Sequence, residues 1–186
     1  MNTAKKIRSM MLAMAALLTF GFAFTSCSNE EDFPPATNTI SFNGTTGNIR
    51  NVVRESGVGI SGGVTNYFEV FYVFINDNAG AAVCIPTKHL GKTMDLTEIW
   101  GIDGDIPTGL YLAFNDKEYA FFSPDENGDF PGNIKEGTMT VTVRDGKVYI
   151  YAKGIGLQYD KNHPEADPVE MPFEVSYSGP YTIEEK

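Results

Sequence analysis

The chain has few of the residues that build metal centres. It contains two cysteines, two histidines and one tryptophan among 186 residues. His89 and His163 have no Cys or His neighbours, so the sequence shows no recognisable zinc-ligand spacing. Basic residues are also scarce, with 14 Lys and Arg against 24 Asp and Glu and a formal net charge of −10. Such an anionic surface repels phosphates, which disfavours nucleic acid and acidic lipid head groups as partners.

A sustained helical period is missing as well. From Ile40 onward, short apolar segments alternate with Gly, Asn, Asp and Pro, and no helical spacing lasts for ten residues. This pattern predicts an antiparallel all-β domain. Its strands must close into a barrel or stack as two sheets, because a long free sheet edge invites pairing with other chains.

The first 26 residues have the pattern of a secretory signal. Lys5, Lys6 and Arg8 form a positive segment, and residues 10–24 are an uncharged, mostly apolar run that ends in the small residues Thr25 and Ser26. The run is shorter than the roughly 20 residues that a helix needs to cross a bilayer. We therefore expect a leader that is removed, not a membrane span.

The residues around Cys27 resemble those of bacterial lipoproteins. The segment Phe24-Thr25-Ser26-Cys27 resembles a lipobox, where a signal peptidase cuts before a cysteine that carries lipid. The following residues, Ser28-Asn29-Glu30-Glu31-Asp32, resemble the acidic export tract of surface lipoproteins of the Bacteroidota. The resemblance implies that Cys27 is acylated, with chains such as palmitate, and that the lipid anchor holds the protein on the outer membrane, facing the cell exterior. The alternative is an ordinary cleaved signal with a cysteine nearby by chance.

These expectations divide the chain into three parts: the signal peptide (1–26), a lipidated tether (27–38) that contains Pro34 and Pro35, and a single all-β domain (39–186). Removal of 26 residues from 186 leaves 160, a normal length for one domain. The leader carries three of the fourteen basic residues and none of the twenty-four acidic ones, so the mature chain has a formal charge of −13.

The second cysteine has no evident partner. If Cys27 is acylated, Cys84 has nothing in the chain with which to form a disulfide. Cys84 lies within the apolar run 81–85, where a lone cysteine is usually a small core side chain. We expect it to be buried and not a nucleophile.

The patterning predicts about eight to ten strands. The expected strands cover residues 40–43, 49–54, 67–75, 81–85, 109–114, 118–122 and 171–177 and both arms of a hairpin over 137–154. The segment 67–75 is apolar on both faces beyond Val70, which predicts a central strand. In the 137–154 hairpin, alternating residues flank Asp145-Gly146, a pair typical of a type I′ turn. Pro86 should stop the strand before it. Residues 90–96 are expected to hold at most a helical turn capped by Asp95 or Thr97, because the segment is too short and too interrupted by glycine for a stable helix of its own.

The C-terminal patterning of Thr-Val repeats, Asp-Gly and Tyr-Ile-Tyr, with the closing Val-Ser-Tyr-Ser-Gly-Pro, resembles small Bacteroidota lipoproteins of lipocalin-like or sandwich form. The resemblance implies either a lipocalin-like barrel or a two-sheet sandwich.

A glycine-rich stretch at 57–63 matches two well-known catalytic or phosphate-binding patterns, G-x-G-x-x-G and, from Gly59, G-x-S-x-G. Both mechanisms need a helix after the loop, either to meet phosphate or to expose the serine. Here a strand follows instead, so we interpret the stretch as a connection between strands.

An acidic segment offers a weak calcium site. Asp125, Asn127, Asp129 and Glu136 place oxygen ligands at the first, third, fifth and twelfth positions of a calcium-loop template. The sixth position is Phe130, where the template needs Gly, and neither flank is helical. We interpret this segment as a solvated turn and expect no metal.

Aromatic side chains are the remaining candidates for ligand contacts. The candidate ligand-binding residues are Tyr149, Tyr151 and Trp100, because aromatic faces stack on sugars or line apolar cavities. Tyr149 and Tyr151 lie on the face of their strand opposite Val148 and Ile150. The alternative for all three is core packing.

Three classes of function follow in order of preference. The first is a non-catalytic binding module for a glycan, a small hydrophobic ligand or a partner protein, without a cofactor. The second is an envelope accessory or structural protein that docks to another surface component. An enzyme would need paired carboxylates, and no spacing of Asp or Glu singles out a pair. The sequence leaves the oligomeric state open.

Overall fold

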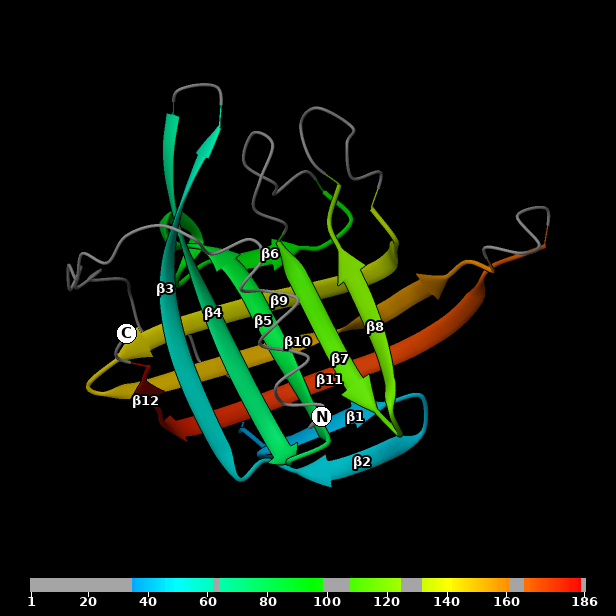
Figure 1. Ribbon diagram of the computed structural model, residues 1–186, viewed down its shortest axis with the longest axis horizontal. Helices are drawn as coiled ribbons and strands as arrows, with labels where there is room; N and C mark the ends of the chain where they lie inside the picture. Colours follow the sequence, from blue (N-terminus) through cyan, green and yellow to red (C-terminus); the bar gives the residue numbers. More distant parts are fainter. Residues whose placement is uncertain (1–34, 62–63, 99–107, 125–131, 161–165, 185–186) are drawn as a thin grey trace.

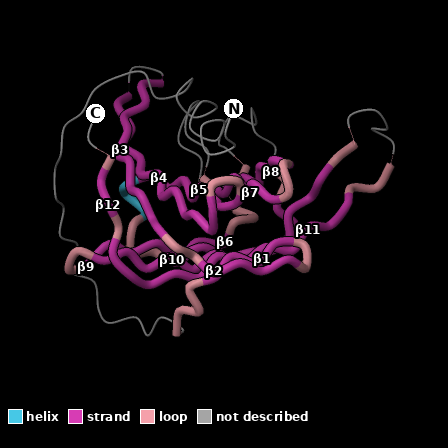
Figure 2. The backbone as a smooth tube through the Cα atoms, turned by 60° about the horizontal axis from the view of Figure 1, so that its bottom comes forward, coloured by secondary structure: helices cyan, strands magenta, loops and turns pink. Residues whose placement is uncertain are grey.

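The computed structural model describes residues 35–61, 64–98, 108–124, 132–160 and 166–184, and in these ranges it is all-β. Figure 1 shows two layers of strands that cross steeply, and Figure 2 shows the layers edge-on. The all-β prediction is confirmed, and of the two forms left open the structure is the two-sheet sandwich. The described ranges contain twelve strands, more than the eight to ten expected. They include no helix that is long and apolar enough to cross a bilayer.

The first sheet, called sheet A, is antiparallel throughout. Its order across the sheet is β2 (Thr45–Asn48), β1 (Thr39–Phe42), β11 (Val169–Pro180), β10 (Lys147–Gln158), β9 (Ile134–Arg144) and β6 (Thr93–Asp95). The longest three strands lie at its centre, and short strands form both edges.

The second sheet, sheet B, has the order β12 (Thr182–Ile183), β3 (Asn51–Ser61), β4 (Val64–Asn76), β5 (Ala79–Pro86), β7 (Gly109–Phe114) and β8 (Lys117–Phe122). Only β12 is parallel to its neighbour. β12 follows β11 directly in the chain, so the C-terminal segment passes from sheet A to the edge of sheet B (Figure 1).

Two-residue turns set the register of three hairpins. Asp145 and Gly146 have φ values of 52° and 71°, as a type I′ turn requires, which confirms the predicted 137–154 hairpin. Asn115 and Asp116, between β7 and β8, have φ values of 51° and 60°. Asn43-Gly44 joins β1 to β2 in the same way. The right-handed twist of these turns matches that of the strands they join.

The core fills the space between the two sheets. Alternate residues of the longer strands enter it, as the sequence pattern predicts, whereas the edge strands β2 and β12 contribute no buried residue. Fully buried members include Val52, Phe71, Val73, Leu110, Phe121, Val141, Val148, Ile150 and Val175. Phe42 of β1 packs its ring 4.7 Å from that of Tyr119 in β8, so aromatic contacts join the two sheets.

The predicted central strand is central in the structure. β4 lies between β3 and β5, with Phe71 and Val73 in the core between the sheets. Val70 and Tyr72 point to the outer face of sheet B, where they form a second buried apolar cluster with Val53, Ala82 and Cys84. Both faces of β4 are therefore buried between Val70 and Val73, which agrees with the apolar residues on both faces of the predicted central strand.

The predicted helical turn at 90–96 is wrong. A short 3₁₀ turn, η1 (Thr87–His89), precedes that segment, and Thr93–Asp95 forms edge strand β6. The reason is a tertiary contact, because β6 pairs with β9 and buries Met94 completely. Asp95 Oδ1 accepts hydrogen bonds from the backbone N–H and the hydroxyl of Thr97, a local turn that ends β6.

The glycine-rich stretch 57–63, interpreted above as a connection between strands, lies largely within β3, which extends to Ser61 and pairs with β4 as a long hairpin. Gly57 and Gly59 lie within β3, and β4 begins at Val64 without an intervening helix among the described residues. A Cβ added to Gly57 would lie 2.2 Å from Cζ of Phe68, so this glycine makes room for the ring on the paired strand. Phosphate binding or a nucleophilic serine would need a helix after the loop, whereas here strand β3 is followed by strand β4.

Candidate functional site on the outer face of sheet A

The outer face of sheet A carries the candidate site. On β10, Val148, Ile150 and Ala152 enter the core, so Tyr149 and Tyr151 point to the opposite face, where both side chains are half-buried. The prediction that these tyrosines lie opposite Val148 and Ile150 is confirmed.

A line of uncharged polar side chains crosses all six strands of this face. It is called the hydroxyl row and consists, in cross-strand order, of Asn48, Thr39, Ser176, Tyr151, Thr140 and Thr93. Neighbouring strands are about 4.8 Å apart, so the row extends about 24 Å. The hydroxyls of Thr93 and Thr140 are 2.9 Å apart.

A second line lies next to the first and contains charges. It is called the charged row and consists of Thr46, Ser41, Glu174, Lys153, Thr138 and Asp95. Lys153 Nζ and Glu174 Oε2 are 3.3 Å apart. The hydrogen bond and the charge of Glu174 raise the pKa of Lys153, and the hydrogen bonds from Thr97 lower the pKa of Asp95. Both rows alternate with core residues, so the same strands support the core and the site.

The two tyrosines line a small pocket of about 170 Å³. Ser176 and Ser178 of β11 form its floor beside the rings, and Pro35 and Ala36 form a wall. The wall is fixed by hydrogen bonds from the following residues. The backbone N–H of Thr37 donates to Ser176 Oγ at 3.1 Å, and Asn38 Oδ1 accepts from the backbone N–H of Ser178 at 2.9 Å.

A wider open groove of about 790 Å³ follows the tyrosine pocket along the strands. Its lining includes Ser41, Asp95, Thr138, Lys153 and Glu174 of the charged row. Glu136, the last of the candidate calcium ligands, also lies in this groove. The groove therefore offers carboxylates, hydroxyls and ammonium groups within one hollow.

Other candidate residues lie outside the described ranges. These are Cys27, Trp100, Asp125, Asn127 and Asp129. The described residues contain no group of three or more His, Cys, Asp or Glu side chains placed to hold a metal ion.

Cys84 is a core side chain, as predicted. It is 6% exposed in the apolar cluster on the outer face of sheet B. Burial raises the pKa of its thiol to about 12, which keeps it protonated at neutral pH. The neighbouring Tyr72 hydroxyl donates to Glu55 Oε2 at 2.9 Å, on the same face.

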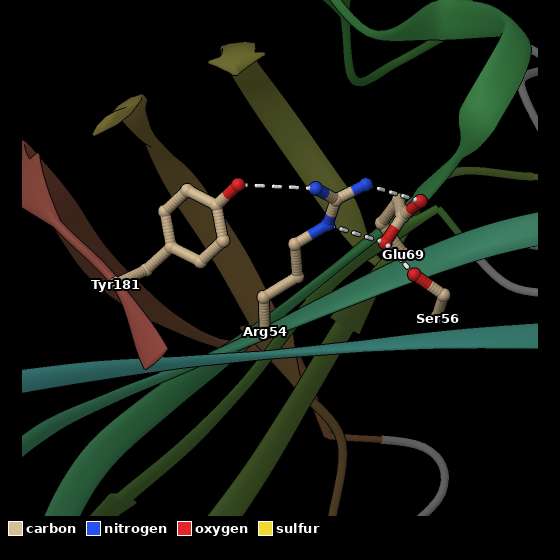
Figure 3. A network of polar contacts seen from close by, with 4 residues as sticks. All are labelled: Arg54, Ser56, Glu69 and Tyr181. Atoms are coloured by element: carbon tan, nitrogen blue, oxygen red, sulfur yellow. Dashed lines mark hydrogen bonds and ion pairs between the residues drawn. The ribbon is translucent and has the colours of Figure 1, made fainter. Parts of the chain in front are cut away.

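A buried polar network that the sequence analysis missed lies on the core side of sheet B (Figure 3). Arg54 donates two hydrogen bonds of 2.9 Å to the carboxylate of Glu69, and Ser56 donates to the same carboxylate at 2.7 Å. Arg54 Nη1 also lies 3.3 Å from the hydroxyl of Tyr181. Glu69 raises the pKa of Arg54 above its usual value. The alternation in β3 places Arg54 on the same face as the core residue Val52. This alternation is the feature of the sequence from which a buried arginine could have been predicted.

Asn133 was missed as well. Its side-chain amide accepts from the backbone N–H of Phe122 at 2.9 Å and donates to the carbonyl of Ala120 at 2.7 Å. Its backbone accepts from the N–H of Leu157 in β10. Asn133 thus pairs with the outer edge of β8 in sheet B and with a strand of sheet A. No pattern in the sequence distinguishes it from other loop asparagines.

The serines and threonines of the two rows were visible in the sequence only as alternating polar residues. Their alignment depends on the register of six strands, which the structure supplies. Comparisons with protein-family models, with curated proteins and with solved structures gave no match to this chain.

Proposed function

We propose that this protein is a lipid-anchored, non-catalytic binding module that captures glycans at the cell surface through the outer face of sheet A. The observation that carries the proposal is the hydroxyl row beside the half-buried rings of Tyr149 and Tyr151. Sugar rings present apolar faces that stack on aromatic rings and hydroxyls that both donate and accept hydrogen bonds. The face supplies the rings of Tyr149 and Tyr151 for stacking and exposed polar side chains such as Asn48, Thr93 and Thr138 for hydrogen bonds, whereas Thr140 and Ser176 of the hydroxyl row are buried.

A small hydrophobic ligand is less well supported. A carrier of the lipocalin kind would need an apolar cavity inside the fold. The space between the sheets is instead occupied by side chains with no exposed surface, such as Phe71, Phe121 and Leu110. The described hollows lie on the polar outer face of sheet A.

The membrane attachment is part of the proposal and rests on the lipobox-like sequence at Cys27. Residues 27–34 number eight, and a fully extended chain of that length spans at most about 28 Å. The first residue that the structure describes, Pro35, lines the tyrosine pocket. The proposed anchor would therefore hold the binding face close to the outer membrane.

An accessory role in the envelope is the second candidate, and one observation favours it. Tyr159 and Val169, at the end of the β10–β11 hairpin, are 52% and 57% exposed. Exposed apolar side chains at a projecting hairpin are typical of contacts between proteins.

A glycan-binding screen tests the proposal. The fragment tested must retain residues 35–38, because Pro35 and Ala36 form a wall of the pocket. Binding to at least one glycan should fall about tenfold, equivalent to about 1.4 kcal/mol, in Tyr151→Ala. Tyr159→Ala is the matched control, because Tyr159 is an exposed tyrosine outside the pocket. Equal effects of the two changes, or no glycan binding, would contradict the proposal.

A further inference from the structure

We propose, building on the glycan-binding function above, that the ligand is an extended and uncharged oligosaccharide chain that lies along β10, from the tyrosine pocket into the adjoining groove. Single sugars and anionic chains would bind poorly. Three features of the face carry this inference.

The first feature is that the pocket and the groove adjoin. Tyr151 and Ser176 line the pocket, and Lys153 and Glu174 line the groove. Each of these groove residues lies two positions from the corresponding pocket residue on the same strand, which is about 7 Å along the sheet. The residues between them, Ala152 and Val175, point into the core. No side chain of β10 or β11 therefore separates the pocket from the groove on this face, and one ligand can contact both hollows.

The second feature is the length of the combined site. From Tyr149 to Ile155 the lining follows six residue steps of β10, about 20 Å. The groove, at about 790 Å³, is several times larger than the pocket, at about 170 Å³. A single sugar in the tyrosine pocket would leave the groove empty, whereas a chain would gain contacts in both.

The third feature is the charge of the groove. Lys153 is paired with Glu174, and Lys135 forms an ion pair with Glu170. The groove also contains the carboxylates of Asp95 and Glu136, so carboxylates outnumber ammonium groups in its lining. An anionic sugar would meet like charges, in a chain whose total charge is already −10. Neutral hydroxyls, in contrast, can donate to these carboxylates.

The test uses the full chain, produced with its leader and extracted in mild detergent. The probes are cello-, xylo-, manno- and malto-oligosaccharides of one to six units, with oligogalacturonates of the same lengths as anionic counterparts. For the neutral series that binds, affinity should rise at least tenfold from the single sugar to the longest chain. The oligogalacturonate of equal length should bind at least tenfold more weakly.

A variant that blocks the groove tests where the oligosaccharide lies. Thr138 is exposed and lines the groove but not the pocket, so Thr138→Trp should abolish the gain with chain length and leave the weak binding of short sugars. Thr182→Trp, at an exposed position of β12 in sheet B, is the control and should bind like the unchanged protein. Circular dichroism of both variants should match that of the parent chain.

The outcomes separate the two proposals. Equal affinity for single sugars and long chains, tighter binding of the anionic series, or full retention of the chain-length gain in Thr138→Trp would overturn the extended-chain inference while glycan binding stood. Failure of every oligosaccharide to bind would overturn both.

Discussion

Arg54 and Glu69 form a buried ion pair with two parallel hydrogen bonds of 2.9 Å on the core side of sheet B. The Glu69 side chain is 5% exposed and that of Arg54 19%. The same arginine lies 5.6 Å from the centre of the Tyr181 ring, in the segment between β11 and β12. The pair therefore connects β3 and β4 of sheet B with the chain leaving sheet A (Figure 3).

Glu69→Ala should destabilise the fold by about 3 kcal/mol, because it leaves the Arg54 guanidinium partly buried without its carboxylate. Urea unfolding followed by circular dichroism measures the change. The matched control is Arg144→Ala, which breaks an exposed pair with Asp145 and should leave stability almost unchanged. Similar losses in the two variants would contradict the role assigned to burial.

Asn133→Ala should cost about 2 kcal/mol, because it leaves the N–H of Phe122 and the carbonyl of Ala120 without their partner. Asn48→Ala, at an exposed position of edge strand β2, should change stability by less than about 0.5 kcal/mol. The two free energies of unfolding can be compared in one urea series. An unchanged free energy of unfolding in Asn133→Ala would contradict this prediction and would mean that water replaces the hydrogen bonds of the amide.

His89 predicts a pH dependence of stability. Burial, followed by the charges of Lys88 and Lys92, lowers its pKa from 6.5 to about 4. Above pH 6.5 the imidazole is neutral in both states. Between pH 6.5 and 4 the unfolded chain binds a proton that the folded chain resists, so stability falls as the pH falls. In His89→Gln this part of the dependence should disappear, and parallel stability curves for the two proteins would contradict the assignment.

The Cys84 thiol should not react with Ellman's reagent in the native protein near pH 8, because it is buried and its pKa is raised to about 12. Reaction should follow only after unfolding in guanidinium. Thr182→Cys, at an exposed position, supplies a positive control that reacts at once. Rapid labelling of Cys84 itself, distinguished from Cys27 by repeating the assay in Cys27→Ala, would mean that the outer face of sheet B opens readily.

Cys27→Ala should move the protein out of the membrane fraction, because the proposed acyl chains supply about 0.8 kcal/mol for each buried methylene. Fractionation with immunodetection measures this. Ser28→Ala is a neighbouring change that leaves the acylated cysteine in place and should not alter the distribution. Membrane retention of Cys27→Ala would rule out the lipid anchor.

Local patterns in the sequence were sufficient for much of the fold. Asp145-Gly146 needs positive φ at both positions, and the alternation on either side determines which face is buried. The two-faced apolar run in β4 likewise indicates a central strand. In each case the deciding interactions lie within a few residues along the chain.

The features that sequence reasoning missed depend on distant contacts. Thr93–Asp95 is a strand because it pairs with β9, more than forty residues further along the chain. The hydroxyl row joins residues of six strands, so its existence depends on every register in sheet A. The alternation in β3 places Arg54 on the core side, but its partner Glu69 lies on β4 and is brought to it by the pairing of the two strands. Candidate residues could be named from the sequence, but their assembly into one face could not.

The short segment that forms the wall of the tyrosine pocket also has a mechanical consequence. Hydrogen bonds join Thr37 to Ser176 and Asn38 to Ser178 of β11, and the chain then enters β1. If the protein is tethered through Cys27, any drag on the domain in flowing medium is transmitted through this attachment. Shear at the cell surface would therefore load the same strand that forms the floor of the binding pocket.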